Sequence, residues 1–212
     1  MQQTTTEIQT SKIPLTNINS ENASEVETVK IYRWTKDEYY KLAELGFFQE
    51  KRVELIDGEI IEMAPMKSPH ATSVSLLNSE LRKFFAKDFI VRSQLPLSFG
   101  KANEPEPDLA IVKGEIRDYA KSHPKKAELI IEVSDATLSY DRNKKASLYA
   151  ENKIKDYWIL NLNGRCLEVY RKPKQDKQLG FIYSERTIFT EEDSVSPLAD
   201  PKAKIKIADI LP

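Results

Sequence analysis

Two acidic residues near the ends of apolar runs offer the clearest chemistry in this sequence. Asp108 begins the run DLAIV, and Glu132 lies near the end of the next run, ELIIEV. If these runs are neighbouring strands, the two carboxylates meet at one edge of a sheet. Hard divalent cations such as Mg²⁺ need oxygen ligands and keep several waters, so two carboxylates and a phosphate oxygen suffice to bind one. Such an ion can activate water and neutralise charge that develops on phosphorus.

A cation from the protein would complete this arrangement. Lys145 lies four residues after Asp141 in a segment of helical pattern, and its long side chain can reach back toward the carboxylates. The alternative is an ordinary surface pair between Asp141 and Lys145, worth only ~0.3 kcal/mol. Lys144 is the rival candidate. The carboxylates also have structural alternatives: Asp108 can start a strand by bonding nearby amides, and Glu132 can face solvent from an exposed sheet face.

Glu54 and His70 are weaker candidates. Glu54 precedes a predicted hairpin turn and can act at the site or pair with Arg52 or Lys51 in a routine exposed contact. His70 stands at the head of a predicted helix, where histidine can contact phosphate, although a structural histidine is the commoner outcome.

The elements that must position these residues follow from local patterns. Thr35 as N-cap, Glu38 as its capping-box partner and Gly46 as the stop predict a short helix after Trp34. Asp57-Gly58 between two alternating apolar runs predicts a tight hairpin.

Apolar spacing predicts two longer helices and a set of strands. The helices are expected over 68–85 and 139–153, and Tyr149, Tyr157 and Trp158 are expected to pack in the core. This order of elements indicates an α/β fold in which a mixed sheet carries helices on its faces. The strands are expected over 89–99, 107–112, 127–133, 156–162 and 165–172, the last two joined at Asn163-Gly164, with peripheral strands and a closing turn over 179–185, 186–190 and 202–212.

Composition predicts one domain and limits its partners. The 212 residues are 40% hydrophobic and 31% charged, which suffices for one sizeable core over 30–212, and we expect a disordered polar tail over 1–29. The net charge of -1 excludes a bulk nucleic-acid binder, so any DNA contact must be local. The basic residues over 113–126 favour a solvated loop, with binding of the DNA backbone as the minority alternative. One cysteine and the absence of a long apolar run predict a cytoplasmic protein with no membrane segment.

Several motifs together resemble a known family. They are PD at 107–108, E-x-S at 132–134, D-R-N-K-K-x-x-x-Y-A at 141–150 and D-Y-W at 156–158. The chain thus resembles the Uma-type restriction endonuclease family of the PD-(D/E)xK nuclease superfamily. The ELIDGEI hairpin and His70 also fit that layout, and the likeness spans about residues 31–172.

The resemblance implies a restriction-endonuclease-like core with flanking helices and extra peripheral strands. It also implies Mg²⁺ or Mn²⁺ as cofactor, with Asp108, Glu132 and Val133 as the metal ligands. Ser134 replaces the lysine of the superfamily's E-x-K element, and Lys145 on the next helix would take over its role. Glu54 would be the additional acidic residue that binds a second metal or orients a water.

Two other positions depart from the family pattern. Asp135 stands where proline is common, and Lys153 stands where relatives usually end the helix with glycine. A non-glycine residue there costs ~1 kcal/mol if its backbone is left-handed.

The resulting hypothesis is a metal-dependent endonuclease that hydrolyses phosphodiester bonds in DNA, with a homodimer as corollary because one site cuts one strand. A catalytically weak or inactive nuclease-fold module that binds a partner or nucleic acid is the main alternative. A phosphoesterase for small molecules, with a closed pocket, is the third.

Overall fold

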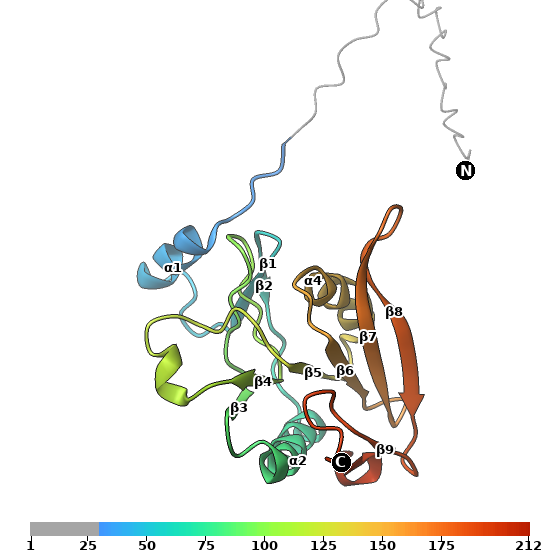
Figure 1. The fold of residues 1–212 in the computed structure, drawn as a ribbon. Helices are drawn as coiled ribbons and strands as arrows, with labels where there is room; N and C mark the ends of the chain where they lie inside the picture. The colour runs from blue at the N-terminus through green and yellow to red at the C-terminus, as the bar shows by residue number, and fades with distance from the viewer. Residues whose placement is uncertain (1–29) are drawn as a thin grey trace, which may run out of the picture. The chain divides into compact units, whose positions relative to one another are not determined.

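A six-stranded mixed sheet organises residues 30–212, the part of the chain that the computed structural model describes (Figure 1). The expected tail over 1–29 lies outside the described residues, and Tyr32–Pro212 form one compact unit. The strand order is β3-β4-β5-β6-β7-β8, in which β5 and β6 are parallel and the other pairs are antiparallel. These strands are β3 (Phe89–Ser93), β4 (Leu109–Lys113), β5 (Leu129–Ser134), β6 (Asp156–Asn161), β7 (Cys166–Asp176) and β8 (Gly180–Phe189).

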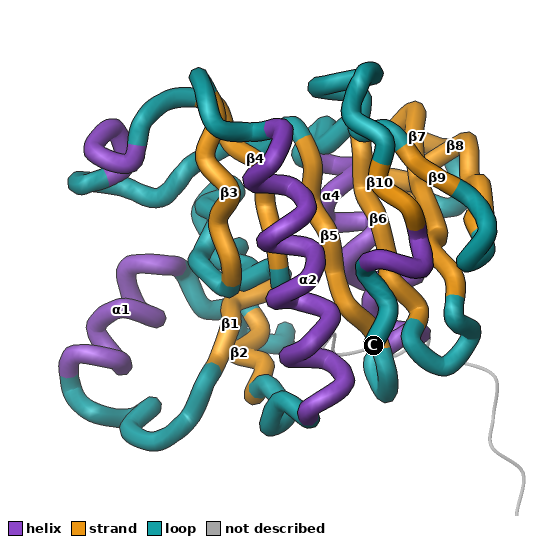
Figure 2. Tube along the Cα trace, turned by 90° about the horizontal axis from the view of Figure 1, so that it is seen from below, coloured by secondary structure: helices purple, strands orange, loops and turns teal. Residues whose placement is uncertain are grey.

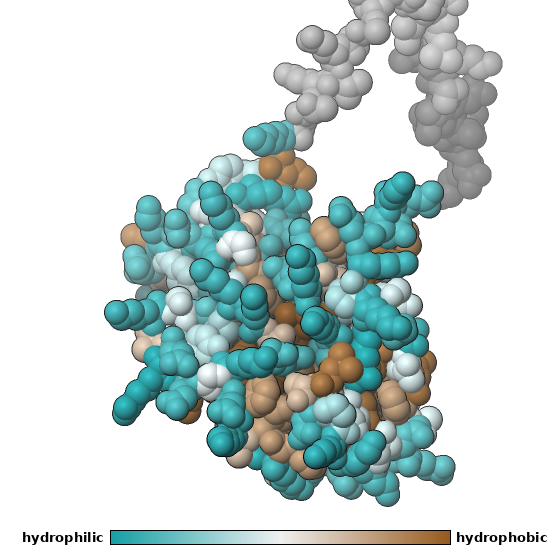
Figure 3. Space-filling model, viewed as in Figure 1, coloured by the Kyte–Doolittle hydropathy of each residue, from teal (hydrophilic) through white to brown (hydrophobic). Residues whose placement is uncertain are grey.

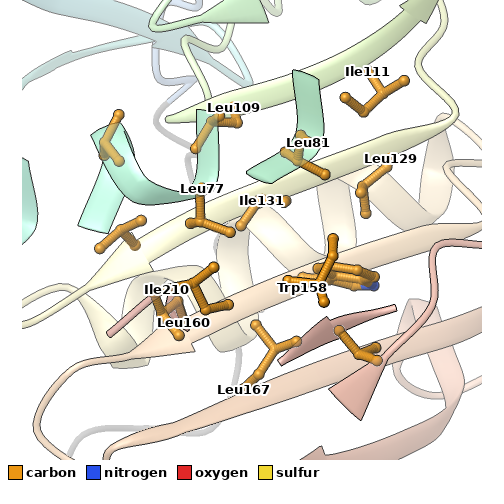
Figure 4. Packing of buried hydrophobic residues seen from close by; sticks show 14 of the residues in the cluster. Leu77, Leu81, Leu109, Ile111, Leu129, Ile131, Trp158, Leu160, Leu167 and Ile210 are labelled. Atoms are coloured by element: carbon orange, nitrogen blue, oxygen red, sulfur yellow. The ribbon is translucent and has the colours of Figure 1, made fainter. Parts of the chain in front are cut away.

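Helices cover both faces of the sheet, as the sequence predicted. Helix α2 (Ser68–Phe84) crosses one face, and α4 (Ala146–Glu151) lies on the other (Figure 2). Leu77 and Leu81 of α2 pack against apolar side chains of the central strands, including Trp158 (Figure 4). On the α4 face, Tyr149 and Tyr157 belong to a second buried cluster. The α/β fold class is therefore confirmed, and the three aromatic residues expected in the core lie there.

The first helix and the hairpin form where their local signals placed them. Helix α1 (Lys36–Glu44) begins at Thr35, and both hydrogen bonds of the capping box with Glu38 are present. Strands β1 (Val53–Ile56) and β2 (Glu59–Glu62) pair around Asp57 and Gly58, whose φ values are 49° and 72°. A Cβ on Gly58 would lie 2.7 Å from the Cβ of Arg33, so this turn requires glycine.

The third helical segment is less regular than its sequence pattern predicts. It consists of α3 (Leu138–Tyr140), a π-helical turn (Asp141–Lys145) and α4. A π turn widens the helix and is frequent at functional sites. Two buried carboxylates form ion pairs near this segment. Asp156 on β6 pairs with Arg171, and Glu168 on β7 pairs with Arg142 of the π turn.

Three expectations about strands were inaccurate. The strand expected over 89–99 ends at Ser93, because Gln94 has a left-handed φ of 51°. The hairpin near Asn163-Gly164 exists, but its loop spans 162–165 and Arg165, with φ 46°, supplies the left-handed residue. The two strands expected over 179–185 and 186–190 are one strand, β8.

The chain ends in small elements on the α2 face. Strands β9 (Ser194–Val195) and β10 (Ile205–Lys206) pair, and a 3-10 turn (Ile207–Asp209) follows. Another 3-10 turn (Ile116–Tyr119) follows β4, much earlier in the chain. Hydrophilic side chains cover most of the face seen in Figure 3. No helix of the described residues is long and apolar enough to cross a membrane.

The end of α4 allows a test of backbone strain. Ile154 N donates to Tyr149 O and Lys153 N donates to Ala150 O, both at 3.0 Å, in a Schellman arrangement with Lys153 at a φ of 59°. We expect Lys153→Gly to raise the free energy of unfolding by about 0.5 to 1 kcal/mol, measured by urea denaturation, because it removes left-handed strain. Lys153→Ala removes the same side chain but keeps the strain, so an equal gain in that variant would contradict this explanation.

The buried Glu168 allows a test of stability against pH. Burial opposes its ionisation, but hydrogen bonds from Arg142 and Tyr170 and the charge of Arg186 outweigh burial and hold its pKa below the usual range. A lowered pKa in the folded state gives stability that is present above the unfolded pKa of about 4.3 and is lost as the pH falls through the folded pKa. We expect Glu168→Gln to lower the free energy of unfolding by about 2 kcal/mol at pH 7.

This deficit should shrink as the pH falls below about 4, because the wild-type glutamate is then protonated as well. Urea denaturation of both proteins across that range measures it. A deficit that stayed constant down to pH 3 would show that the ionised form is not what stabilises the fold.

Candidate active site

Asp108 and Glu132 lie on one face of the sheet, opposite each other. Leu109 pairs with Ile131, and the same antiparallel register continued by one residue places Asp108 beside Glu132. Asp108 N donates to Glu132 Oε2 at 3.4 Å, and Val133 N donates to Asp108 Oδ2 at 2.8 Å. Both carboxylates line a cavity of about 250 Å³. The two carboxylates therefore lie close together where neighbouring strands end, as the sequence analysis expected.

Lys145 reaches the carboxylates from the π turn. Its Nζ lies 3.1 Å from Glu132 Oε1 and 3.3 Å from Glu54 Oε1, and the side chain is 7% exposed. Burial favours the neutral amine, but Glu132, Glu54 and the other nearby carboxylates outweigh it and raise the pKa of Lys145. The residue is therefore an ammonium ion at neutral pH.

The rival residue Lys144 points elsewhere. It pairs with Asp57 at the tip of the β1–β2 hairpin, at 2.7 Å. These two adjacent lysines therefore make different contacts: Lys144 binds the hairpin turn, and Lys145 lies in the cavity.

Glu132 is the most deeply buried carboxylate of the site. Besides Lys145, Tyr149 donates to its Oε1 at 2.6 Å. Burial raises the pKa of Glu132 to about 8, although the charge of Lys145 opposes this rise. Burial therefore opposes the ionisation of Glu132, and the ammonium group of Lys145 favours it.

Asp108 is ionised by its surroundings. Burial opposes this, but His70 Nε2 at 2.9 Å from Oδ1 and the amide of Val133 outweigh burial and lower the pKa of Asp108. Gln94 Nε2 also donates to Oδ1, at 3.2 Å. His70 was a weak candidate in the sequence, and its contact with Asp108 places it in the site.

Glu54 joins the same cavity from β1. Its Oε2 accepts from Glu106 N at 3.1 Å, and its Oε1 faces Lys145. The alternative of an exposed pairing with Lys51 or Arg52 does not occur, because Lys51 pairs with Glu62 and Arg52 with Glu106.

Two site residues escaped the sequence analysis. Gln94 depends on a left-handed backbone that no sequence signal marks. Asp141 was treated as a surface partner of Lys145, yet it is 3% exposed and lines the cavity. The four-residue spacing of Asp141, Lys145 and Tyr149 puts all three on one buried stripe, which could have revealed it.

The basic loop over 113–126 lies away from this site. Lys113 ends β4, the strand that Asp108 precedes, so the loop starts at the far end of that strand. Lys113 pairs with Glu128, and His123 lies 3.9 Å from Glu104.

The donor set can be tested against a divalent cation. Asp108 and Glu132 offer hard oxygen ligands whose lone pairs are not all used, and Val133 can offer only its carbonyl because its side chain has no ligand atom. Among residues 30–212, no cluster of three or more His, Cys, Asp or Glu side chains is arranged to hold a metal. The site thus suits a cation that keeps water and phosphate ligands, as Mg²⁺ does, and not one that needs a full protein cage.

Comparisons with known proteins agree with this fold. A crystal structure described as a putative nuclease belonging to DUF820, from Anabaena variabilis ATCC 29413, superposes with a TM-score of 0.64 at 19% sequence identity, covering 83% of this chain and 96% of that one. At that identity the likeness shows a shared nuclease-type fold. No curated protein matches. The model of the Uma2 family, described as "Putative restriction endonuclease", matches residues 36–207, and the chain therefore belongs to the Uma2 family of restriction-endonuclease-like proteins.

Proposed function

We propose that this protein is a divalent-metal-dependent endonuclease that hydrolyses phosphodiester bonds in DNA. The observation that carries the proposal is the meeting of Asp108, Glu132 and Lys145 in one cavity, with Lys145 Nζ 3.1 Å from Glu132. Membership of the Uma2 family supports the nuclease class, and metal and DNA are the additional parts of the proposal.

The metal ligands in this proposal are the carboxylates of Asp108 and Glu132 and the carbonyl of Val133, with Mg²⁺ or Mn²⁺ as the ion. When bound, such an ion supplies an activated water and stabilises negative charge on the phosphate. His70 and Gln94 hold Oδ1 of Asp108, so its ligand geometry is set before any ion binds.

Lys145 contributes a positive charge and not a base. Its raised pKa keeps it protonated, so it can donate to a phosphate oxygen as charge develops in the transition state. Its ion pairs with Glu132 and Glu54 fix the ammonium group in place. Glu54 is then a positioning residue for Lys145.

The contact between Lys145 and Glu132 also bears on the alternative of an inactive binding module. That alternative gains support if the lysine points away from the two carboxylates, and here it points toward them. For double-strand cleavage we propose a homodimer, because one such site cuts one strand and twofold dimers are the commonest closed assembly.

The proposal predicts metal-dependent nicking of supercoiled DNA by the purified protein. We expect Asp108→Asn and Glu132→Gln to abolish Mg²⁺-dependent cleavage, because each loses a ligand charge, and Lys145→Met to lower the rate by about 10² to 10³. Gel assays on supercoiled and linear DNA with Mg²⁺, Mn²⁺ and chelator measure this.

The matched control is Glu191→Gln, which removes an exposed glutamate that pairs with Arg165 outside the cavity. This variant should cleave like the wild type. Circular dichroism must show that all variants are folded. If wild-type protein neither cuts DNA nor binds Mg²⁺ in calorimetry, the binding-module alternative replaces the nuclease.

A further inference from the structure

Asp141 is the buried carboxylate of the cavity to which the proposed function gives no role. It lies on the π turn, 3% exposed, and Tyr157 fixes its main chain by donating to its carbonyl oxygen at 3.0 Å. Its charge raises the pKa values of both Glu132 and His70, so it lies within electrostatic range of the proposed metal site.

The hydrogen-bond partners of Asp141 differ in kind from those of its neighbours. Thr137 Oγ1 donates to Asp141 Oδ2 at 2.8 Å, and the Ser134 hydroxyl also favours its ionised form. A hydroxyl is both donor and acceptor, and it can rotate. Asp141 can therefore take up a proton and keep its partners, because Thr137 can turn from donating to accepting.

The other carboxylates that line the cavity have partners of a different kind. Each accepts from at least one group that only donates, and such a group cannot turn to accept a hydrogen bond. Within the described residues these donors are Lys145 and Glu106 N for Glu54, Val133 N and Gln94 for Asp108, Lys145 and Asp108 N for Glu132, Lys51 for Glu62, Arg52 for Glu106, and Lys67 and Ala136 N for Asp135.

Hydrolysis of a phosphodiester needs a group with this property. The attacking water must lose a proton as its oxygen bonds to phosphorus, and Lys145, already an ammonium ion, cannot accept it. A general base acts best when its pKa lies near the operating pH. Burial raises the pKa of Asp141, with the charge of Lys145 opposing the rise.

We propose that Asp141 is the general base that accepts the proton of the attacking water, an inference that rests on the proposed nuclease function. The water O–H bond breaks and its proton passes to Asp141, the water oxygen bonds to phosphorus, and the bond from phosphorus to the leaving sugar oxygen breaks. A second water protonates the leaving oxygen, and Asp141 then returns its proton to the solvent hydroxide. The net reaction consumes one water and yields an alcohol and a phosphomonoester end.

The test combines loss and chemical rescue in the full-length protein. We expect Asp141→Asn and Asp141→Ala to cut supercoiled DNA about 10² to 10⁴ times more slowly than the wild type with Mg²⁺. Added formate should restore part of the rate of Asp141→Ala, because that variant leaves space for a small carboxylate. It should not restore Asp141→Asn, whose amide fills the space.

Two measurements separate this role from others. Calorimetry should give both Asp141 variants the wild-type affinity for Mg²⁺, and a lost affinity would overturn the proposal by making Asp141 a metal ligand. The matched control is Asp193→Asn, which removes an exposed aspartate outside the cavity that also accepts from a threonine hydroxyl, that of Thr190, and should cut at close to the wild-type rate without a formate effect.

The outcomes also separate this inference from the function on which it rests. If Asp141→Asn cleaves as fast as the wild type, Asp141 is not the general base, and the proposed nuclease function still holds. The same conclusion follows if a folded Asp141→Ala cleaves slowly and formate does not raise its rate. If the wild type shows no metal-dependent cleavage, both the proposed nuclease function and the role of Asp141 as its general base are wrong.

Discussion

The burial of one ammonium ion among several carboxylates constrains the rest of this structure. An isolated charge taken out of water costs several kcal/mol, and only close partners of opposite sign compensate it. Lys145 obtains such partners in Glu132 and Glu54, at 3.1 and 3.3 Å. These partners come from two separate parts of the chain, β5 and the β1–β2 hairpin. The hairpin, the sheet and the third helical segment must therefore be docked together before the lysine is stable in its position.

The surrounding fold meets this demand with contacts that lie outside the cavity. Arg142, on the same π turn, pairs with Glu168 on β7, and Lys144 pairs with the hairpin turn at Asp57. Three residues of this one turn, Arg142, Lys144 and Lys145, thus hold the segment to strand β7, to the hairpin and to the cavity. Because residues held on rigid elements keep their geometry better than residues on loops, these contacts suit the proposed site, which would present charges to a phosphate.

Much of this arrangement was predictable from the sequence, and the remainder has identifiable physical causes. The capping box of α1, the Asp57-Gly58 turn and the apolar strands depend on local signals, which a sequence displays directly. The position of Asp108 opposite Glu132 followed from the assumption that their strands are neighbours. Gln94 and the inward direction of Asp141 could not be predicted in the same way, because a left-handed backbone and a π turn are imposed by tertiary packing.

The balance of charge in the cavity connects the fold to its proposed chemistry. Four carboxylates, Glu54, Asp108, Glu132 and Asp141, outnumber the single ammonium group of Lys145 in this cavity. Burial, together with the charges of neighbouring carboxylates, raises the pKa values of Glu132 and Asp141. A phosphodiester would add another negative charge to a cavity in which acidic side chains already outnumber basic ones. Its entry therefore requires further positive charge. In the proposed function a divalent cation would supply this charge and favour the ionised form of Glu132, so that metal and substrate would favour each other's binding.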